Sequence, residues 1–150
     1  MHKFCKTLLL IVSVVSCTKQ DTIKKDTSVC ATTMAEIAGN YHLTKFESVS
    51  SNTGAAQDRT SALTSCELSG VYRLNIDSTV TYSELSTCNN SGTGIWQASE
   101  WSFYTFFASG TRSRIGGIVT SITGWDCTHL VLRTNYPTVD SNYRYTLTKF

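Results

Sequence analysis

Proline, charged residues and long apolar runs are all scarce in this sequence. One proline occurs among 150 residues, and charged side chains make up only 16% of the chain. The longest mostly apolar run, Leu8–Val15, is much shorter than the roughly 20 residues that a membrane-spanning helix needs. After residue 40, no stretch has the apolar spacing of a long amphipathic helix. These absences argue against a helical bundle and against a helical membrane span.

A basic excess is also missing. The chain has 13 basic and 11 acidic residues, and Lys3 and Lys6 lie in an N-terminal segment that we expect to be removed. Without those two lysines the balance is 11 to 11, so nothing predicts nucleic-acid binding. In contrast, 19 serines and 23 threonines are present, and this composition favours strands and turns over helices. The length predicts a single domain.

Motifs for catalysis and for metal binding are absent as well. The sequence contains no Gly-x-Ser-x-Gly elbow, phosphate-binding loop, dinucleotide-binding glycine pattern or His-Glu-x-x-His motif. It has no Cys-x-x-Cys, and His42 and His129 are the two histidines beyond residue 17, too few for a zinc site. We therefore expect a protein that is not an enzyme and that carries no metal and no cofactor.

The first 17 residues are organised like a secretion signal. Lys3 and Lys6 precede the apolar run, which ends at Val14-Val15-Ser16-Cys17. That ending resembles the bacterial lipobox, in which aliphatic and small residues precede a cysteine that becomes lipidated. The resemblance implies a lipoprotein signal peptide over residues 1–16 and acyl chains such as palmitate on Cys17. An ordinary cleaved signal and a weak membrane helix are the alternatives.

Residues 17–36 are expected to form the lipidated cysteine and a polar tether. They have mixed charge, many threonines and few side chains to bury. A lipid anchor predicts a location in the cell envelope, on the periplasmic or the surface face of an outer membrane. We expect a monomer that is attached to the membrane through this anchor.

Residues 37–150 are predicted to form one all-β domain. Short stretches rich in β-branched and aromatic residues alternate there with turn residues. Tyr72 and Leu74 share one face of a stretch whose other face carries Arg73, which indicates a strand with one buried face. The predicted strands are Tyr41–Ser48, Gly70–Ile76, Val80–Leu85, Gly94–Ala98, Glu100–Ala108, Ile115–Ile122, Thr128–Thr134 and Tyr143–Thr148.

Eight strands joined by short turns favour an antiparallel up-and-down barrel, because closure removes both edges of the sheet. A two-layer sandwich is the alternative. Turns are expected at Asn75–Thr79 and Ala108–Thr111, and we interpret Gly116-Gly117 as a bulge or a barrel-corner kink within a strand. Met34–Ala38 is expected to form one short turn that caps an end of the barrel.

Four cysteines remain beyond Cys17, and export would place them in an oxidising compartment. Cys66 and Cys88 lie equally far from a hairpin centred near Asp77, so we expect them to face each other and form a disulfide. By elimination, Cys30 pairs with Cys127.

Aromatic side chains are the most informative set in the predicted barrel. A barrel of eight strands holds either packed side chains or one small ligand. We expect a small hydrophobic ligand to bind between rings that point toward the axis, namely Tyr72, Tyr82, Trp101, Phe103, Tyr143 and Tyr145. The alternative is that these rings, with Trp96 and Trp125, simply fill the core. A filled interior would favour a structural or adhesive role, as an interaction module of the cell envelope. The stretch Trp101–Phe107 is apolar on both faces, so its outer face is either covered or exposed as a patch.

The order of several short motifs resembles the lipocalin-like lipoproteins of Bacteroidota. The motifs are Ala38–Lys45, Cys66, Tyr72–Thr79, Cys88, Gly94–Trp96, Asp126–Leu132 and Tyr145–Lys149. The resemblance covers residues 37–150 and implies a lipocalin-like barrel able to bind small hydrophobic molecules. Tyr41 stands where that family usually has a tryptophan that packs across the closed end.

A second resemblance supplies an alternative function. Ala108–Ser113 is similar to the Ser-Gly-x-Arg-Tyr loop of lysozyme-inhibitor lipoproteins, although the tyrosine is missing. This resemblance implies that Ser109 and Arg112 would enter an acidic enzyme cleft as hydrogen-bond donors.

Overall fold

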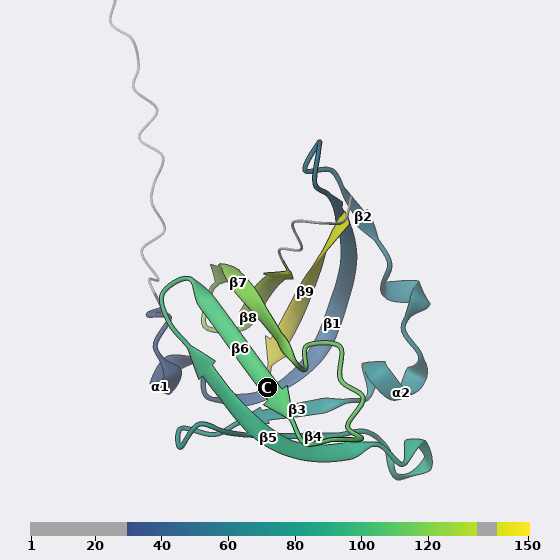
Figure 1. The fold of residues 1–150 in the computed structure, drawn as a ribbon, viewed down its shortest axis with the longest axis vertical. Helices are drawn as coiled ribbons and strands as arrows, with labels where there is room; N and C mark the ends of the chain where they lie inside the picture. The colour runs from purple at the N-terminus through teal and green to yellow at the C-terminus, as the bar shows by residue number, and fades with distance from the viewer. Residues whose placement is uncertain (1–29, 135–140) are drawn as a thin grey trace, which may run out of the picture.

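The computed structural model of the chain describes residues 30–134 and 141–150 (Figure 1). The strands are β1 (Gly39–Ser50), β2 (Ala56–Asp58), β3 (Val71–Leu74), β4 (Thr79–Ser83), β5 (Ser91–Ala98), β6 (Ser102–Phe107), β7 (Ile118–Trp125), β8 (His129–Thr134) and β9 (Ser141–Lys149). The helical elements are α1 (Met34–Ile37), α2 (Ser65–Leu68) and the single 3-10 turns η1 (Thr60–Ala62) and η2 (Ser86–Cys88). Within those two described ranges, no helix has the length and apolar character needed to span a bilayer.

Eight of the strands close into an antiparallel up-and-down barrel. From β3 to β9, each strand pairs with the next one in the sequence. β1 completes the ring, because it pairs with β3 through residues 39–42 and with β9 over most of its length. The predicted eight-stranded barrel is confirmed, and the sandwich alternative is excluded.

All eight predicted strands are present, with shifted ends. β5 begins earlier than the predicted Gly94, and β7 occupies Ile118–Trp125 instead of Ile115–Ile122. The sequence does not predict β2, because its three residues are small or polar and all are exposed. β2 pairs only with the second half of β1, from Glu47 opposite Asp58 to Val49 opposite Ala56.

The connections differ more from expectation than the strands do. The hairpin at Asn75–Thr79 is confirmed, with the Asn75 N–H donating to the Thr79 carbonyl. The β6–β7 connection, however, covers residues 108–117 and is longer than the predicted turn at Ala108–Thr111. Gly116-Gly117 is not a bulge within a strand, because both glycines precede β7. Gly117 has a φ of 72°, a conformation that glycine adopts without a steric cost.

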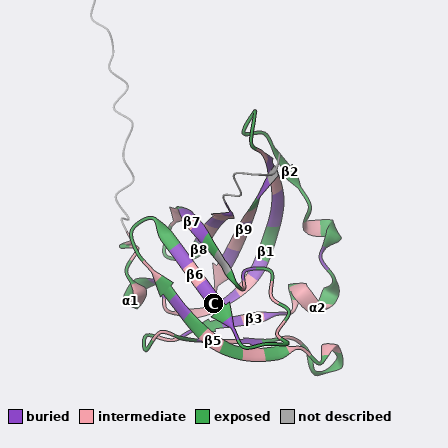
Figure 2. Ribbon diagram, in the orientation of Figure 1, coloured by how far each residue is buried: buried purple, intermediate pink, exposed green. Residues whose placement is uncertain are grey.

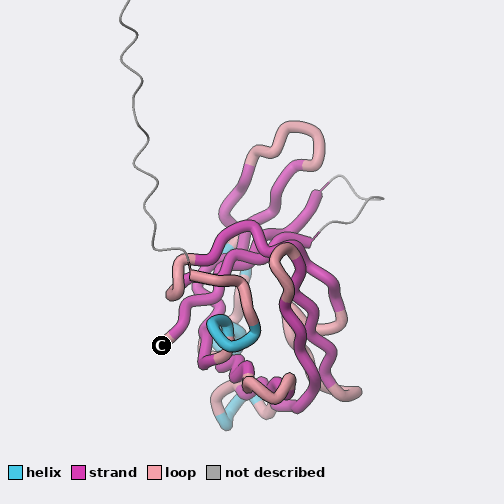
Figure 3. The backbone as a smooth tube through the Cα atoms, turned by 90° about the vertical axis from the view of Figure 1, so that its left-hand side faces the viewer, coloured by secondary structure: helices cyan, strands magenta, loops and turns pink. Residues whose placement is uncertain are grey.

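The barrel has two different ends. At the α1 end, Ile37 and Tyr41 are fully buried, and the Tyr41 hydroxyl donates a hydrogen bond to the Ile37 carbonyl. Seen from that side, α1 lies across the ring of strands (Figure 3). Thr33 caps this helix by accepting from the Glu36 N–H. The predicted capping turn at Met34–Ala38 is therefore confirmed. We name the opposite end, beside α2, the α2 end.

Two disulfides fix segments outside the strands. Cys30–Cys127 attaches the residues before α1 to the β7–β8 turn, and Cys66–Cys88 joins α2 to η2. Both predicted pairings are confirmed. The first disulfide also shows that the last part of the predicted tether, from Cys30 onward, is fixed to the folded domain.

β1 and β9 continue past the barrel at the α2 end. Figure 1 shows both strands running beyond the others, with β2 beside β1 near the tip. In this extension β1 no longer pairs with β3, and the connection that carries η1 and α2 runs alongside β1 instead. The Arg59 N–H donates to the Phe46 carbonyl and so holds that connection in place. The inner face of the extension is therefore open on one side, which leaves room for a site.

Candidate functional site

The barrel interior is filled with aromatic side chains, in keeping with the alternating buried and exposed positions along its strands (Figure 2). Tyr72, Tyr82 and Phe103 are 1–2% exposed. The rings of Tyr72 and Tyr82 lie 4.6 Å apart, and Trp96 lies 6.0 Å from Phe103. Burial raises the pKa of Tyr72 to about 12. These three residues were expected to bind a ligand, but their rings are packed in the core, as the alternative expectation had it.

Trp101 does not point into the barrel, so the expectation that its ring faces the axis is wrong. It lies in the turn between β5 and β6, at the α1 end, and is 71% exposed. The alternation that places Phe103 inside does not extend back to residue 101, because β6 begins at Ser102.

Tyr143 and Tyr145 lie on the extension at the α2 end, where they meet Phe46 of β1. The register places Phe46 opposite Tyr145 and Ser48 opposite Tyr143. Each tyrosine ring stacks on Phe46 with a centroid distance of 5.4 Å, at interplanar angles of 30° for Tyr143 and 18° for Tyr145. Tyr145 is buried, whereas Tyr143 is 38% exposed. Two of the predicted residues thus belong to a three-ring stack in which Phe46 and Tyr145 are part of the core and Tyr143 is partly exposed.

This stack forms one wall of a cavity of about 430 Å³, which we name the aromatic cleft. Its lining residues are Phe46, Ser48, Arg59, Ala62, Arg114, Tyr143 and Tyr145. The volume falls in the range of small-molecule sites, which combine apolar walls with a few polar groups. In this cleft the aromatic wall comes from β1 and β9, and the two guanidinium groups come from the connections.

Arg114 reaches the cleft from the β6–β7 connection. Its Cζ lies 5.3 Å from the centre of the Phe46 ring, a cation–π distance. Its Nε donates to Oε1 of Glu67 on α2 at 2.5 Å. A capping box holds Glu67 in turn, since the Thr64 N–H donates to Glu67 Oε2 at 2.8 Å. The short helix α2 therefore orients the guanidinium over the aromatic wall.

Glu67 and Arg114 are both charged at neutral pH. Burial opposes the ionisation of Glu67, but hydrogen bonds from Arg114 and Thr64 outweigh it and lower the pKa of this carboxyl group. The hydrogen bond with Glu67 raises the pKa of Arg114.

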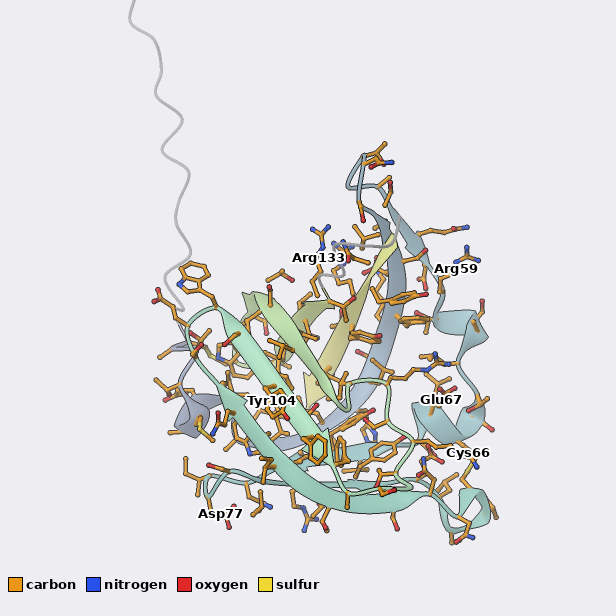
Figure 4. The ribbon with its side chains drawn as sticks, in the orientation of Figure 1. Arg59, Cys66, Glu67, Asp77, Tyr104 and Arg133 are labelled. Carbon is orange, nitrogen blue, oxygen red and sulfur yellow. A yellow bond between two sulfur atoms is a disulfide. The ribbon has the colours of Figure 1, made fainter. Side chains whose placement is uncertain are left out.

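Arg59 supplies a second guanidinium to the cleft. Its Nε donates to the Ser48 hydroxyl at 3.5 Å. Across the described part of the chain, no carboxylate forms an ion pair with Arg59. The neighbouring Asp58 accepts from the Thr60 N–H at 2.8 Å instead. Figure 4 shows Arg59 and Glu67 on the same side of β1, at β2 and at α2 respectively.

A larger and more polar cavity of about 820 Å³ adjoins the aromatic cleft and shares Arg114 with it. In this polar pocket, Glu84 accepts hydrogen bonds from the Tyr82 hydroxyl at 2.7 Å and from Asn90 at 2.8 Å. Asn90 also donates to the Arg112 carbonyl at 2.7 Å and accepts from the Arg112 N–H at 3.1 Å. The polar groups of this pocket are largely paired with one another.

The polar pocket contains one group of potential metal ligands, Cys66, Glu84 and Cys88, whose ligand atoms lie within 4.8 Å of one another. The two sulfur atoms are joined in a disulfide, however, so the group offers no thiolate. It is the only such group among residues 30–134 and 141–150.

His129 belongs to the opposite end of the barrel. Its Nδ1 lies 2.9 Å from Asp126 in the exposed β7–β8 turn. The backbone N–H and then the side chain of His129 lower the pKa of Asp126 to about 2. This pair closes a turn and contributes to neither cavity.

The outer face of β5, β6 and β7 carries exposed apolar residues. Ile95, Phe106 and Val119 are 50%, 53% and 66% exposed. Ile95 lies opposite Phe106, and Val119 lies opposite Tyr104, which Figure 4 labels on β6. The stretch Trp101–Phe107 therefore exposes its outer face, the second of the two expectations for it.

Sequence reasoning missed Phe46, Arg59 and Arg114. Phe46 lies in the predicted first strand, but its contact with Tyr145 depends on the register between the first and last strands. The two arginines lie in connections, where no periodic pattern indicates the direction of a side chain. Arg114 directly precedes a predicted strand, which was the only signal for it, whereas Arg59 follows β2, a strand that the sequence does not predict.

Comparison with known proteins offers no function to transfer to this chain: no protein-family model, curated protein or solved structure matches it. The site is therefore interpreted from its own geometry. Stacked rings and two guanidinium groups line one small cavity, and such a lining can hold a molecule with an apolar body.

Proposed function

We propose that this protein is a lipoprotein of the cell envelope whose barrel domain binds a small hydrophobic ligand in the aromatic cleft. The observation that carries the binding proposal is the Phe46 ring, stacked between Tyr143 and Tyr145 on the wall of a cavity of about 430 Å³. Aromatic faces of this kind bind apolar molecules through burial and ring stacking. The cleft at the α2 end replaces the filled interior as the proposed site.

The envelope location is supported by the lipobox-like sequence Val14–Cys17 and the polar residues that follow it. Those residues lie outside the described part of the chain. The two disulfides favour an oxidising compartment, as export would provide. In this proposal the lipid on Cys17 attaches the domain to an outer membrane, and a monomeric barrel presents the cleft to its ligand.

The ligand-binding proposal is tested by titrating naphthalene-2-methanol, a neutral apolar probe, into the purified protein by isothermal calorimetry. Tyr143→Ala should weaken binding about tenfold, because it removes one stacked ring from the wall. Trp101→Ala is the matched control, since that ring is exposed at the other end of the barrel. Equal effects of the two substitutions, or no binding at all, would contradict the proposal.

The anchor is tested by growing cells with radiolabelled palmitate. Label should enter the wild-type protein, and Cys17→Ala should abolish its incorporation and release the protein from the membrane fraction. Equal labelling of the two proteins would show that Cys17 is not the anchor.

Inhibition of a lysozyme-type hydrolase is a second candidate function. The observation in its favour is that two hydrogen bonds with Asn90, one donated by each residue, hold the backbone of Arg112 while its side chain stays exposed. This alternative predicts that micromolar protein inhibits lysozyme and that Arg112→Ala relieves the inhibition. An absence of inhibition at that concentration would exclude it.

A further inference from the structure

We infer that the aromatic cleft selects ligands in which an anionic group, a carboxylate or a sulfonate, is attached to a flat apolar body. This inference rests on the proposed function, because it names the chemical class that the same cleft would take. It follows from the two arginines, which give the small cavity a charge that the binding of a neutral ligand does not need.

Glu67 holds Arg114 in place but leaves some of its hydrogen-bond donors without a partner in the described residues. A guanidinium has five N–H donors, and the hydrogen bond to Glu67 uses the one on Nε. Its Cζ lies over the Phe46 ring and Arg114 lines the cleft, and within the described residues its two terminal nitrogens form no hydrogen bond. An anion lying against the stacked rings would meet these donors without displacing Glu67.

Arg59 leaves the cleft with a net positive charge. Glu67 balances one guanidinium, and in the described residues nothing acidic balances the other. The Ser48 hydroxyl, which also lines the cleft, accepts from Arg59 and keeps its side chain at the rim. Two guanidinium groups facing one cavity suit a carboxylate or sulfonate, because their planar donors match such oxygens.

The aromatic wall of the cleft defines the apolar part of the ligand. The stacked rings expose mainly Tyr143, at 38%, while Phe46 and Tyr145 are 7% and 5% exposed. A flat ring system can stack on this wall, and offset stacking is the arrangement that aromatic rings prefer. Its charged substituent would then extend toward Arg59 and Arg114.

The test compares two probes that share their rings and differ in charge, naphthalene-2-carboxylate and naphthalene-2-methanol, by calorimetry with the purified protein. The carboxylate should bind about tenfold more tightly, because hydrogen bonds to a charged group are stronger than neutral ones. Its affinity should fall when sodium chloride is raised, whereas that of the alcohol should not.

Arg59→Ala should remove most of the preference for the carboxylate, so that the carboxylate and the alcohol bind the variant with similar affinities. Arg112→Ala is the matched control, because Arg112 is an exposed arginine that lines only the polar pocket. Circular dichroism confirms that both variants keep the β fold. Arg59 is chosen over Arg114 because it forms no ion pair among the residues described, so its loss leaves no carboxylate unpaired.

The outcomes separate the two proposals. Equal affinities for the two probes would overturn the inference and leave the proposed function standing. A failure of both probes to bind would overturn the proposed function and the inference with it. Equal losses of carboxylate binding in Arg59→Ala and Arg112→Ala would also overturn the inference, because the preference would then reflect overall charge.

Discussion

Arginine has two distinct roles in this protein, depending on the face of the β1–β9 pair on which it lies. On the outer face, Arg144 donates to Glu47 from Nε at 2.7 Å and from Nη2 at 3.0 Å, and Lys45 adds a contact of 2.9 Å. That group is saturated and structural. On the inner face, Arg59 and Arg114 keep donors available. The hydrogen bonds that each arginine forms with carboxylates therefore distinguish Arg144, which stabilises the sheet, from the arginines that can bind a ligand.

Glu47→Gln should lower the free energy of unfolding by about 1–2 kcal/mol at pH 7. The carboxylate is 5% exposed and loses its charge-assisted bonds in the variant, while its partners retain contact with water. Urea denaturation measures the loss. Glu100→Gln is the control, since this exposed carboxylate forms no ion pair in the described residues.

The same effect should depend on pH in a defined direction. The hydrogen bond from Arg144 outweighs burial and lowers the pKa of Glu47 in the folded protein. Its contribution is therefore present above the pKa of an unfolded glutamate, about 4.3. It is lost as the pH falls through the lowered value. A difference between wild type and Glu47→Gln that persisted undiminished at the acid end of the titration would contradict this assignment.

At the scale of elements, the eight barrel strands and the hairpin at Asn75–Thr79 were predictable, and the longer connections were not. Period-2 alternation identifies a strand locally, as in Tyr72 and Leu74 of β3, which are both buried. The β6–β7 connection has no such pattern. It nevertheless inserts Ile115, which is 1% exposed, into the core, and the Thr105 hydroxyl donates to the Ile115 carbonyl. The apolar character of Ile115 led to its prediction as a strand residue. In the structure it lies in a turn that is buried by tertiary contacts.

Gly94→Ala should destabilise the β5–β6 pair by about 2–3 kcal/mol. A Cβ at residue 94 would lie 2.0 Å from the Phe106 carbonyl oxygen, which is backbone and cannot rotate away. Gly124→Ala, in β7, is the matched control, because its Cβ would make only ordinary contacts with Val131, from 3.4 Å. Thermal unfolding distinguishes them, and similar melting temperatures for the two variants would contradict the packing described for β5.

The Cys66–Cys88 disulfide should contribute about 3 kcal/mol through loop closure, and Cys30–Cys127 should contribute more, about 4–5 kcal/mol. The reason is the length of chain that each closes, with sequence separations of 22 and 97. Double alanine variants of each pair, unfolded in urea, measure the two contributions. A thiol assay that detects free Cys30, Cys66, Cys88 or Cys127 in the native protein would contradict the assigned pairing.

At the scale of the whole molecule, the number of turn-delimited strands was enough to predict a closed barrel, but not where a ligand would bind. Of the six residues expected to bind it, Tyr143 and Tyr145 line the aromatic cleft. The cleft joins the first strand to the last, and the bond from Arg114 to Glu67 spans 47 residues. Such a site depends on strand register and on connections, which sequence periodicity does not specify. The lipid anchor, in contrast, is a local motif, and it stays a prediction.

The central claim is that the aromatic cleft, and neither the filled interior nor the apolar outer face of β5–β7, is the ligand site. It is tested most directly by amide chemical-shift mapping of the isotope-labelled protein during titration with naphthalene-2-carboxylate. Saturable shifts are expected around Phe46, Arg59, Arg114 and Tyr143, at the α2 end, while the signals of the outer strand faces stay unchanged. Shifts centred on Ile95, Phe106 and Val119, or no saturable shifts anywhere, would contradict it.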